Sequence, residues 1–418
     1  MAMRLRFPAA PLLAACLALC CGRAAAAEWS RPRLALETAD GAHGLVLQLA
    51  AQFRWSYLYT EPAGGGERTS RSRLLFRRLR PVLRGHLFGD QLRWLLHLNL
   101  VPGAVELMDL WLDYRLHDWV QVRLGQMKIP YTRYRLNSFK ERIAVDWSPA
   151  TIAFGCERQL GVMLHNGIGD PPEYEFELGL FNGVNARSSN GIGLEQAYAE
   201  PVPNPSDLAD PDPLFDQMHA ELALHLAYNS GAFNRRRPSD LTGGPPRWSL
   251  GLSWAWDLQP RARRDLQMRL APEVELRWAH WALGGQLYLG LFDPAHGGGS
   301  YAPGMLGGLV YTSHLFAERY ELGLRYAIVH RLGDLRRDAR REAEAQIAAA
   351  PAAERPALEQ RHALTGRVRS DHELVLAFNW YLFGTTLKWQ TDAGLLLREL
   401  DDDSLLDARL RTQLVLAF

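Results

Sequence analysis

The chain has 418 residues, and its 47 Lys and Arg nearly balance its 46 Asp and Glu, giving a formal net charge of +1 at pH 7. This balance does not indicate a nucleic-acid partner, and it leaves the charge sign of a small solute open. After the N-terminal segment there is no apolar run of about 18 residues, which excludes a helical membrane protein but not a β-barrel.

The N-terminal segment has the pattern of a signal peptide. Arg4 and Arg6 precede a mostly apolar stretch, and four small residues, 24–27, follow it. We therefore expect residues 1–27 to be removed after Ala27, and the protein to be exported. An alternative is that residues 13–16 form a lipobox, which would leave Cys16 lipidated.

Sixteen segments of alternating apolar and polar residues follow. At about 3.4 Å per residue and about 40° of tilt, ten residues cross the apolar band of an outer membrane. The sequence therefore predicts that residues 28–418 form an all-β fold, a sixteen-stranded antiparallel transmembrane β-barrel. The predicted strands are 45–59, 73–88, 91–100, 105–116, 119–129, 158–168, 173–183, 217–229, 246–257, 266–279, 281–293, 303–314, 318–331, 368–382, 385–398 and 405–418.

The connections between these segments alternate in length, as in outer-membrane barrels. Tight turns are predicted at positions such as 89–90 and 383–385, and the long connections include 130–157, 184–216 and 332–367, which we expect to be extracellular. The connection 230–245 is long, yet it lies at the end of the barrel where short turns are predicted. An incorrect pairing of the predicted strands is therefore an alternative there.

The long connection 332–367 is rich in Ala, Glu, Arg and Gln, which predicts a helical insertion. We interpret it as a solvated insertion within the barrel. A partner-binding hairpin is the alternative.

Basic residues are predicted on the water-filled side of several strands. On 73–88 the leucines at 75, 79, 83 and 87 define the lipid side, so Arg78, Arg80 and Arg84 face the lumen. Arg77 falls on the lipid side and Pro81 in mid-strand, and both indicate a β-bulge or a register shift.

The connection 130–157 is predicted to fold inward as a net positive constriction that favours anions. The predicted pore-lining and anion-contacting residues are Arg78, Arg80, Arg84, Arg93, Arg123, Lys128, Arg133 and Arg135. For any one of them, the alternative is an ion pair within the wall, because acidic residues such as Asp109 and Asp113 alternate on neighbouring strands.

The last strand, Leu406 to Phe418, alternates strictly and ends on an aromatic residue. A terminal Phe of this kind is part of the signal that the barrel assembly machinery of Gram-negative bacteria reads. This end predicts a bacterial outer-membrane protein surrounded by lipid, although an amphipathic edge strand of a soluble sandwich would give the same local pattern.

Five short motifs between residues 74 and 184 occur in the order seen in the phosphate-selective porin O/P family, which this region resembles. They are Arg77-Arg78-Leu79-Arg80 with Leu87-Phe88-Gly89-Asp90, Glu106-Leu107-Met108-Asp109 with Leu112-Asp113-Tyr114-Arg115, Gly125 to Pro130, Arg158 to Val162, and Phe181-Asn182-Gly183. The resemblance implies a sixteen-stranded, trimeric outer-membrane channel. The residues after Pro130 differ from the acidic-containing version of the family.

The sequence as a whole predicts an outer-membrane porin for passive diffusion of small hydrophilic solutes, with anions such as phosphate favoured. A porin without anion preference is the first alternative. An outer-membrane barrel enzyme is the second, although no G-x-S-x-G or H-E-x-x-H pattern is present. An adhesive barrel that uses 332–367 is the third. The exported chain keeps only Cys156, so we expect no disulfide, no metal site and no cofactor.

Overall fold

The computed structural model describes residues 3–6, 34–61, 68–101, 104–156, 158–167, 172–183, 220–231, 233, 237–258, 266–293 and 301–418. The predicted cleavage site at Ala27, the alternative lipidation site at Cys16, and the whole of the long connection 184–216 lie outside these residues.

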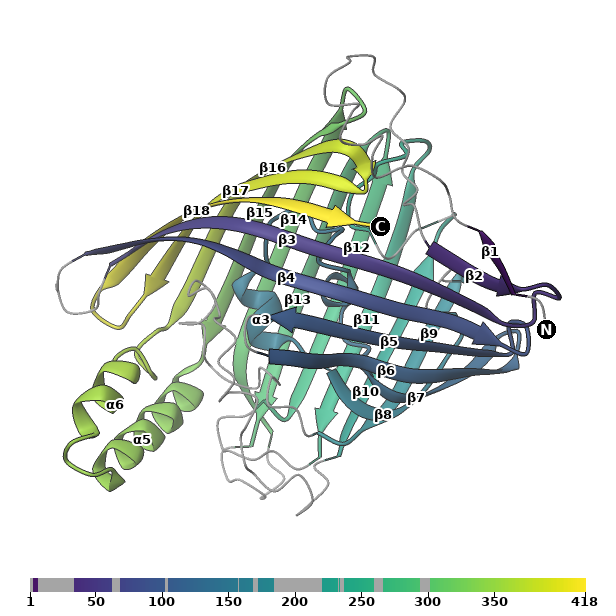
Figure 1. Ribbon diagram of the computed structural model, residues 1–418. Coiled ribbons are helices and arrows are strands. Elements are labelled where there is room, and N and C mark those ends of the chain that lie inside the picture. The colour runs from purple at the N-terminus through teal and green to yellow at the C-terminus, as the bar shows by residue number, and fades with distance from the viewer. Residues whose placement is uncertain are drawn as a thin grey trace.

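Sixteen antiparallel strands form one closed sheet, as predicted (Figure 1). Each strand overlaps the segment expected from the sequence. The strands are β3 (Gly44–Thr60), β4 (Thr69–Leu87), β5 (Leu92–Val101), β6 (Ala104–His117), β7 (Val120–Lys128), β8 (Arg158–His165), β9 (Tyr174–Phe181), β10 (Glu221–Asn229), β11 (Arg247–Asp257), β12 (Met268–Trp278), β13 (Trp281–Phe292), β14 (Ala302–Phe316), β15 (Tyr320–Arg331), β16 (Ser370–Thr385), β17 (Leu387–Glu399) and β18 (Ser404–Ala417).

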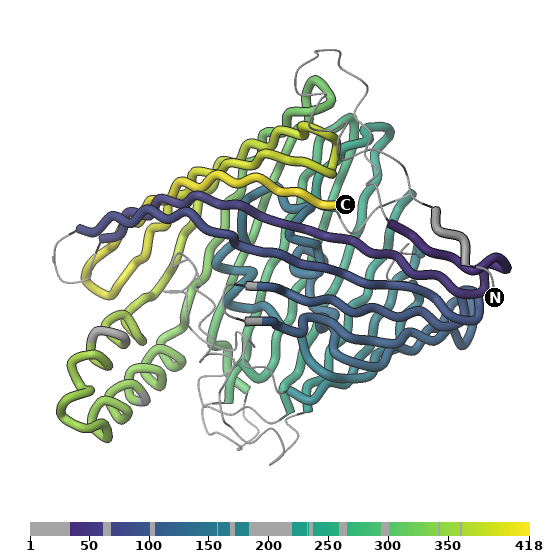
Figure 2. Tube along the Cα trace, in the orientation of Figure 1, coloured from purple at the N-terminus to yellow at the C-terminus, as the bar shows by residue number. Residues whose placement is uncertain are grey.

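The barrel closes where the last strand pairs with the first barrel strand. β18 runs antiparallel to β3 from Ala408↔Tyr59 to Ala417↔Ala50, and the two strands lie side by side in Figure 2. Phe418 and Leu49 complete the closure with two backbone hydrogen bonds of 2.8 and 3.0 Å. Two short strands, β1 (Met3–Arg6) and β2 (Leu34–Thr38), pair with each other, and β2 also pairs with β3.

The alternation expected from the sequence places apolar side chains outside and polar ones inside. On β18, Leu406 and Leu410 are 44% and 41% exposed, whereas Arg409 and Arg411 are 5% and 3% exposed. Water and lipid are thus separated by a single layer of backbone, because successive side chains of a strand point to opposite faces.

The bulge predicted on the second barrel strand is present at Arg77. The β3–β4 register passes from Gln52↔Arg78 to Phe53↔Phe76, so the register skips Arg77. The expected lipid-facing position of Leu75 is therefore wrong: it pairs with Arg54, whose side chain is fully buried inside the barrel. Leu74 and Phe76 take the outer face instead, at 78% and 53% exposed.

The connection 230–245 is long in the structure too, although it lies at the short-turn end of the barrel. β10 pairs directly with both β9 and β11, so the strand pairing is correct there. We call residues 230–246 the turn-side segment. Its Leu241 packs against Leu315 and Tyr381, so the segment enters the barrel instead of lying outside it.

Helices occur in two of the long connections. Residues 129–157, which we call the constriction loop, contain α2 (Arg133–Leu136) and α3 (Pro149–Phe154). The predicted helical insertion contains α5 (Gly333–Ala349) and α6 (Arg355–Arg361), which project away from the barrel in Figure 1. No helix in the described part of the chain has the length and apolar character needed to cross a membrane.

Candidate pore constriction

The constriction loop begins at β7 and is held there by a buried lysine. Lys128 Nζ donates to the backbone carbonyls of Arg135, Leu136 and Asn137 at 3.0 to 3.3 Å. These carbonyls close the short helix α2, whose last turn offers unpaired acceptors. Lys128 therefore fixes the loop to the wall.

The loop then crosses to the opposite wall. Thr132 N donates to Ser253 Oγ on β11, and Arg133 N donates to the carboxylate of Glu273 on β12 at 2.9 Å. The Arg133 side chain pairs with Glu175 on β9 at 3.2 Å. Three strands thus hold the start of the loop across the lumen.

Small residues on the wall make room for the returning half of the loop. A Cβ on Gly307 would lie 2.5 Å from Phe154 Cε2, and a Cβ on Gly323 would lie 2.2 Å from Ile143 Cγ2. Phe154 stacks on Tyr288 with ring centroids 5.0 Å apart. Only glycine allows this close an approach, so the loop packs directly against the backbone of β14 and β15 at these two positions.

Polar side chains of β17 bind the backbone of the same half. Lys388 and Gln390 donate to the carbonyl of Arg142, and Asp392 accepts from the N–H of Val145, each at 3.0 Å. The loop is therefore held along the β11–β17 side of the barrel wall.

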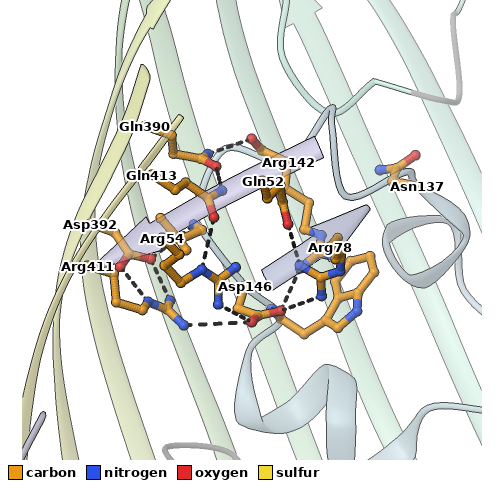
Figure 3. A network of polar contacts seen from close by, with 12 residues as sticks. Gln52, Arg54, Arg78, Asn137, Arg142, Asp146, Gln390, Asp392, Arg411 and Gln413 are labelled. Atoms are coloured by element: carbon orange, nitrogen blue, oxygen red, sulfur yellow. Dashed lines mark hydrogen bonds and ion pairs between the residues drawn. The ribbon is translucent and has the colours of Figure 1, made fainter. Parts of the chain in front are cut away.

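One carboxylate lies at the centre of an arginine cluster (Figure 3). The carboxylate of Asp146 is 2.7 Å from Arg142, 3.1 Å from Arg54, 3.7 Å from Arg78 and 3.9 Å from Arg411. Arg411 is also held by Asp392 through two hydrogen bonds. We call these four arginines and Asp146 the Asp146 cluster. Even with Asp392 included, positive charges exceed negative ones by two.

The charges in this cluster control the ionisation of its carboxylate. Burial alone would raise the pKa of the Asp146 carboxyl, but Arg54, Arg78 and Arg142 outweigh it and hold this pKa well below its usual value. Asp146 is therefore ionised at neutral pH.

A second group of basic residues surrounds the part of the lumen that remains open. Arg135, Lys140, Asp146 and Trp147 of the loop are only partly buried. Arg158 on β8 is electrostatically coupled to Arg80, Lys128 and Arg135. Burial, followed by the charges of Arg142 and Arg158, lowers the pKa of Arg135 to about 9, so it keeps its charge at pH 7. We call Arg80, Arg135 and Arg158 the pore arginines; Arg158 also pairs with Asp109 of β6 at 2.8 Å.

The predicted residues fall into two groups. The structure places Arg78, Arg80 and Arg135 beside the constriction loop. Arg78 forms an ion pair with Asp146, and Arg80 donates to Asn99 at 3.1 Å and lies 5.0 Å from the centre of the Phe139 ring. Arg84 shares the inner face of β4 with Arg80, by alternation.

The other predicted residues lie in contacts of the wall or loop. Arg123 pairs with Asp113 at 2.5 Å, and Arg93 lies 3.4 Å from Asp90 at the turn end. Lys128 and Arg133 anchor the loop as described above. Each of these four residues therefore makes a contact within the wall or the loop, which is the alternative to a pore-lining role.

The prediction did not include Arg54, Arg158 and the central position of Asp146. The first could have been found by alternation, since Arg54 lies between Gln52 and Ser56 on the inner face of β3. The role of Asp146 has no local signal, because its four arginine partners come from β3, β4, β18 and the loop itself.

Comparison with known proteins agrees with the expected resemblance. Residues 47–203 match the family model of phosphate-selective porins O and P. No curated protein matches the sequence.

Solved structures with a similar fold are outer-membrane channels. The anion-selective porin from Comamonas acidovorans is 13% identical, with a TM-score of 0.54 over 90% of this chain and 100% of the other. The outer-membrane channel DcaP of Acinetobacter baumannii is 11% identical, with a TM-score of 0.53 over 91% and 99% of the two chains. OmpF of Salmonella typhi is 10% identical, with a TM-score of 0.52 over 91% and 100%. These likenesses establish the porin fold.

Proposed function

We propose that this protein is an outer-membrane porin, a channel and not an enzyme, that passes small anions by passive diffusion. The observation that carries the proposal is the excess of arginine over carboxylate where the constriction loop narrows the lumen. The Asp146 cluster and the pore arginines belong to one narrow region, since Arg142 is electrostatically coupled to Arg80 and Arg135.

The physical basis is the focusing of charge in a narrow passage. Fixed positive charges between low-dielectric walls raise the local concentration of anions and lower that of cations. Arginine suits this role because its guanidinium stays charged and presents several N–H donors to an oxyanion. In the described part of the chain, Arg78 Nε and Arg142 Nε are buried without a hydrogen-bond acceptor, so donors outnumber acceptors at the constriction.

Location and assembly belong to the same proposal. The outer face of the barrel is apolar, and Phe418 ends the closing strand, as expected for a substrate of the barrel assembly machinery. The match to the porin O and P family supports a bacterial outer membrane and, through the family resemblance, a homotrimer.

The experiment is conductance of the purified protein in planar bilayers under a potassium chloride gradient. We expect stepwise insertion and a reversal potential of the anion-selective sign. Steps with no ion preference would leave a general porin, the alternative function. A folded barrel that gives no steps would contradict the channel function.

A further inference from the structure

The pore side of the constriction loop is not uniformly polar. Its partly buried residues include the apolar Leu136 and Trp147 as well as the cations Arg135 and Lys140. An inorganic oxyanion gains no binding free energy from an apolar surface, whereas an organic acid buries its hydrocarbon part against such a surface.

Arginines at the constriction are paired with aromatic rings. The guanidinium carbon of Arg142 lies 3.9 Å from the Trp147 ring centroid, and that of Arg135 lies 5.1 Å from it. Arg80 and Arg78 lie 5.0 and 5.2 Å from the Phe139 ring. Stacking uses the face of a guanidinium, while its N–H groups lie in the plane, so one arginine can stack and still hold a carboxylate.

An acidic residue lies at the same place. Asp146 keeps 18% of its side chain exposed on the pore side, within 4 Å of Arg142 and Arg78. Glu106 on β6 adds negative charge near Arg80. The fixed charges of this region sum to a positive value, so they attract anions as a class, and the apolar surface of Trp147 and Leu136 is what separates an organic carboxylate from phosphate.

We propose that the preferred solutes of this channel are small organic monocarboxylates with a planar apolar body, and not inorganic phosphate. This inference rests on the proposed anion channel. The carboxylate is held by the pore arginines, and the apolar body lies against Trp147 and Leu136.

The test uses bi-ionic reversal potentials of the purified protein, at mildly alkaline pH where inorganic phosphate is mainly a dianion. Benzoate, acetate and phosphate are each measured against chloride. We expect benzoate to be more permeant than acetate despite its larger size, and more permeant than phosphate.

Variants locate the effect. In Trp147→Leu we expect the benzoate-to-acetate permeability ratio to fall about fivefold, since the planar face is lost. Trp147→Phe keeps that face and retains most of the preference. Trp111→Leu is the matched control, because Trp111 also stacks with an arginine, Arg123 at 3.9 Å, but lies on β6 outside the constriction loop.

The outcomes distinguish a failure of the proposed solute preference from a failure of the proposed anion channel. An anion-selective channel in which acetate equals or exceeds benzoate, or phosphate exceeds both, overturns the solute class alone. The same holds if Trp147→Leu, shown to be folded by its heat-modifiable mobility, keeps the wild-type ratio. A cation-selective reversal potential in potassium chloride overturns the anion channel and this inference together.

Discussion

Arg237 and Glu141 form an ion pair inside the barrel, with Arg237 Nε 3.0 Å from Glu141 Oε2. The two residues belong to connections from opposite ends of the barrel, the turn-side segment and the constriction loop. Phe233 of the same segment lies under Arg277 and Arg133, with ring-to-guanidinium distances of 4.0 and 5.2 Å. The constriction loop is therefore supported from the turn side as well as from the wall.

Breaking this ion pair should make the constriction loop more mobile. In Arg237→Gln we expect larger current fluctuations at unchanged mean selectivity, because the pair lies beside the pore arginines and not among them. Single-channel recordings measure the effect. Glu141→Gln should behave alike, and the double variant should add little, since both changes remove one interaction. Fluctuations identical to wild type in all three would contradict the supporting role.

Removing the central carboxylate should have two effects at once. Asp146→Asn takes a negative charge out of the Asp146 cluster, so we expect a higher anion-to-cation permeability ratio. Four arginines also lose their shared partner, and breaking such a buried ion pair costs about 3 kcal/mol. We therefore expect a lower thermal unfolding midpoint, measured by circular dichroism in detergent. A lower ratio in a folded variant would contradict the assigned charge balance.

The pore arginines and the wall arginines should respond differently to the same change. We expect Arg80→Gln to reduce the anion-to-cation permeability ratio by about threefold, because a fixed charge is lost where the lumen is narrow. Arg123→Gln is the matched control, since Arg123 pairs with Asp113 on the wall. Its ratio should stay near that of the wild type. An equal loss in both variants would mean that the whole lumen, and not the constriction, sets the selectivity.

The pH dependence follows from the lowered pKa of Asp146. A carboxyl group with a lowered folded pKa contributes stability that is present above its unfolded pKa, near 4, and is lost as the pH falls through the folded value. We therefore expect the titration of Asp146 to leave the single-channel conductance unchanged from about pH 7 to pH 4. The constriction loop should become more mobile only below about pH 4. A transition in wild type between pH 5 and 6 that Asp146→Asn lacks would contradict this assignment.

The helical insertion should be dispensable for conduction. Its helix α5 packs Leu335 and Ala339 against the rim, and Arg336 and Arg340 pair with Asp401. Replacing residues 333–361 by a short Gly-Ser linker should leave conductance and selectivity unchanged in bilayers. A changed selectivity would assign the insertion a part in the pore entrance.

Much of the barrel was determined by the sequence alone. The period of two in segments such as 405–418 fixes which side chains face lipid, because a strand exposes alternate residues to opposite faces. The conflict between Arg77 and the apolar stripe around it was enough to predict a bulge. The helical composition of 332–367 likewise predicted α5 and α6, because helix propensity acts within a few turns of the chain.

The constriction itself was decided by the tertiary structure. The sequence predicted Arg78, Arg80 and Arg135 as pore residues, which stays a prediction, and could not separate them from Arg123 and Arg133, which are held by carboxylates on other strands. Asp146 is central only because closure of the barrel brings Arg54, Arg78 and Arg411 to the same point, across sequence separations of 68 to 265 residues. Charge cancellation depends on distance in space, so the net charge at the pore follows from the folded loop and not from the composition.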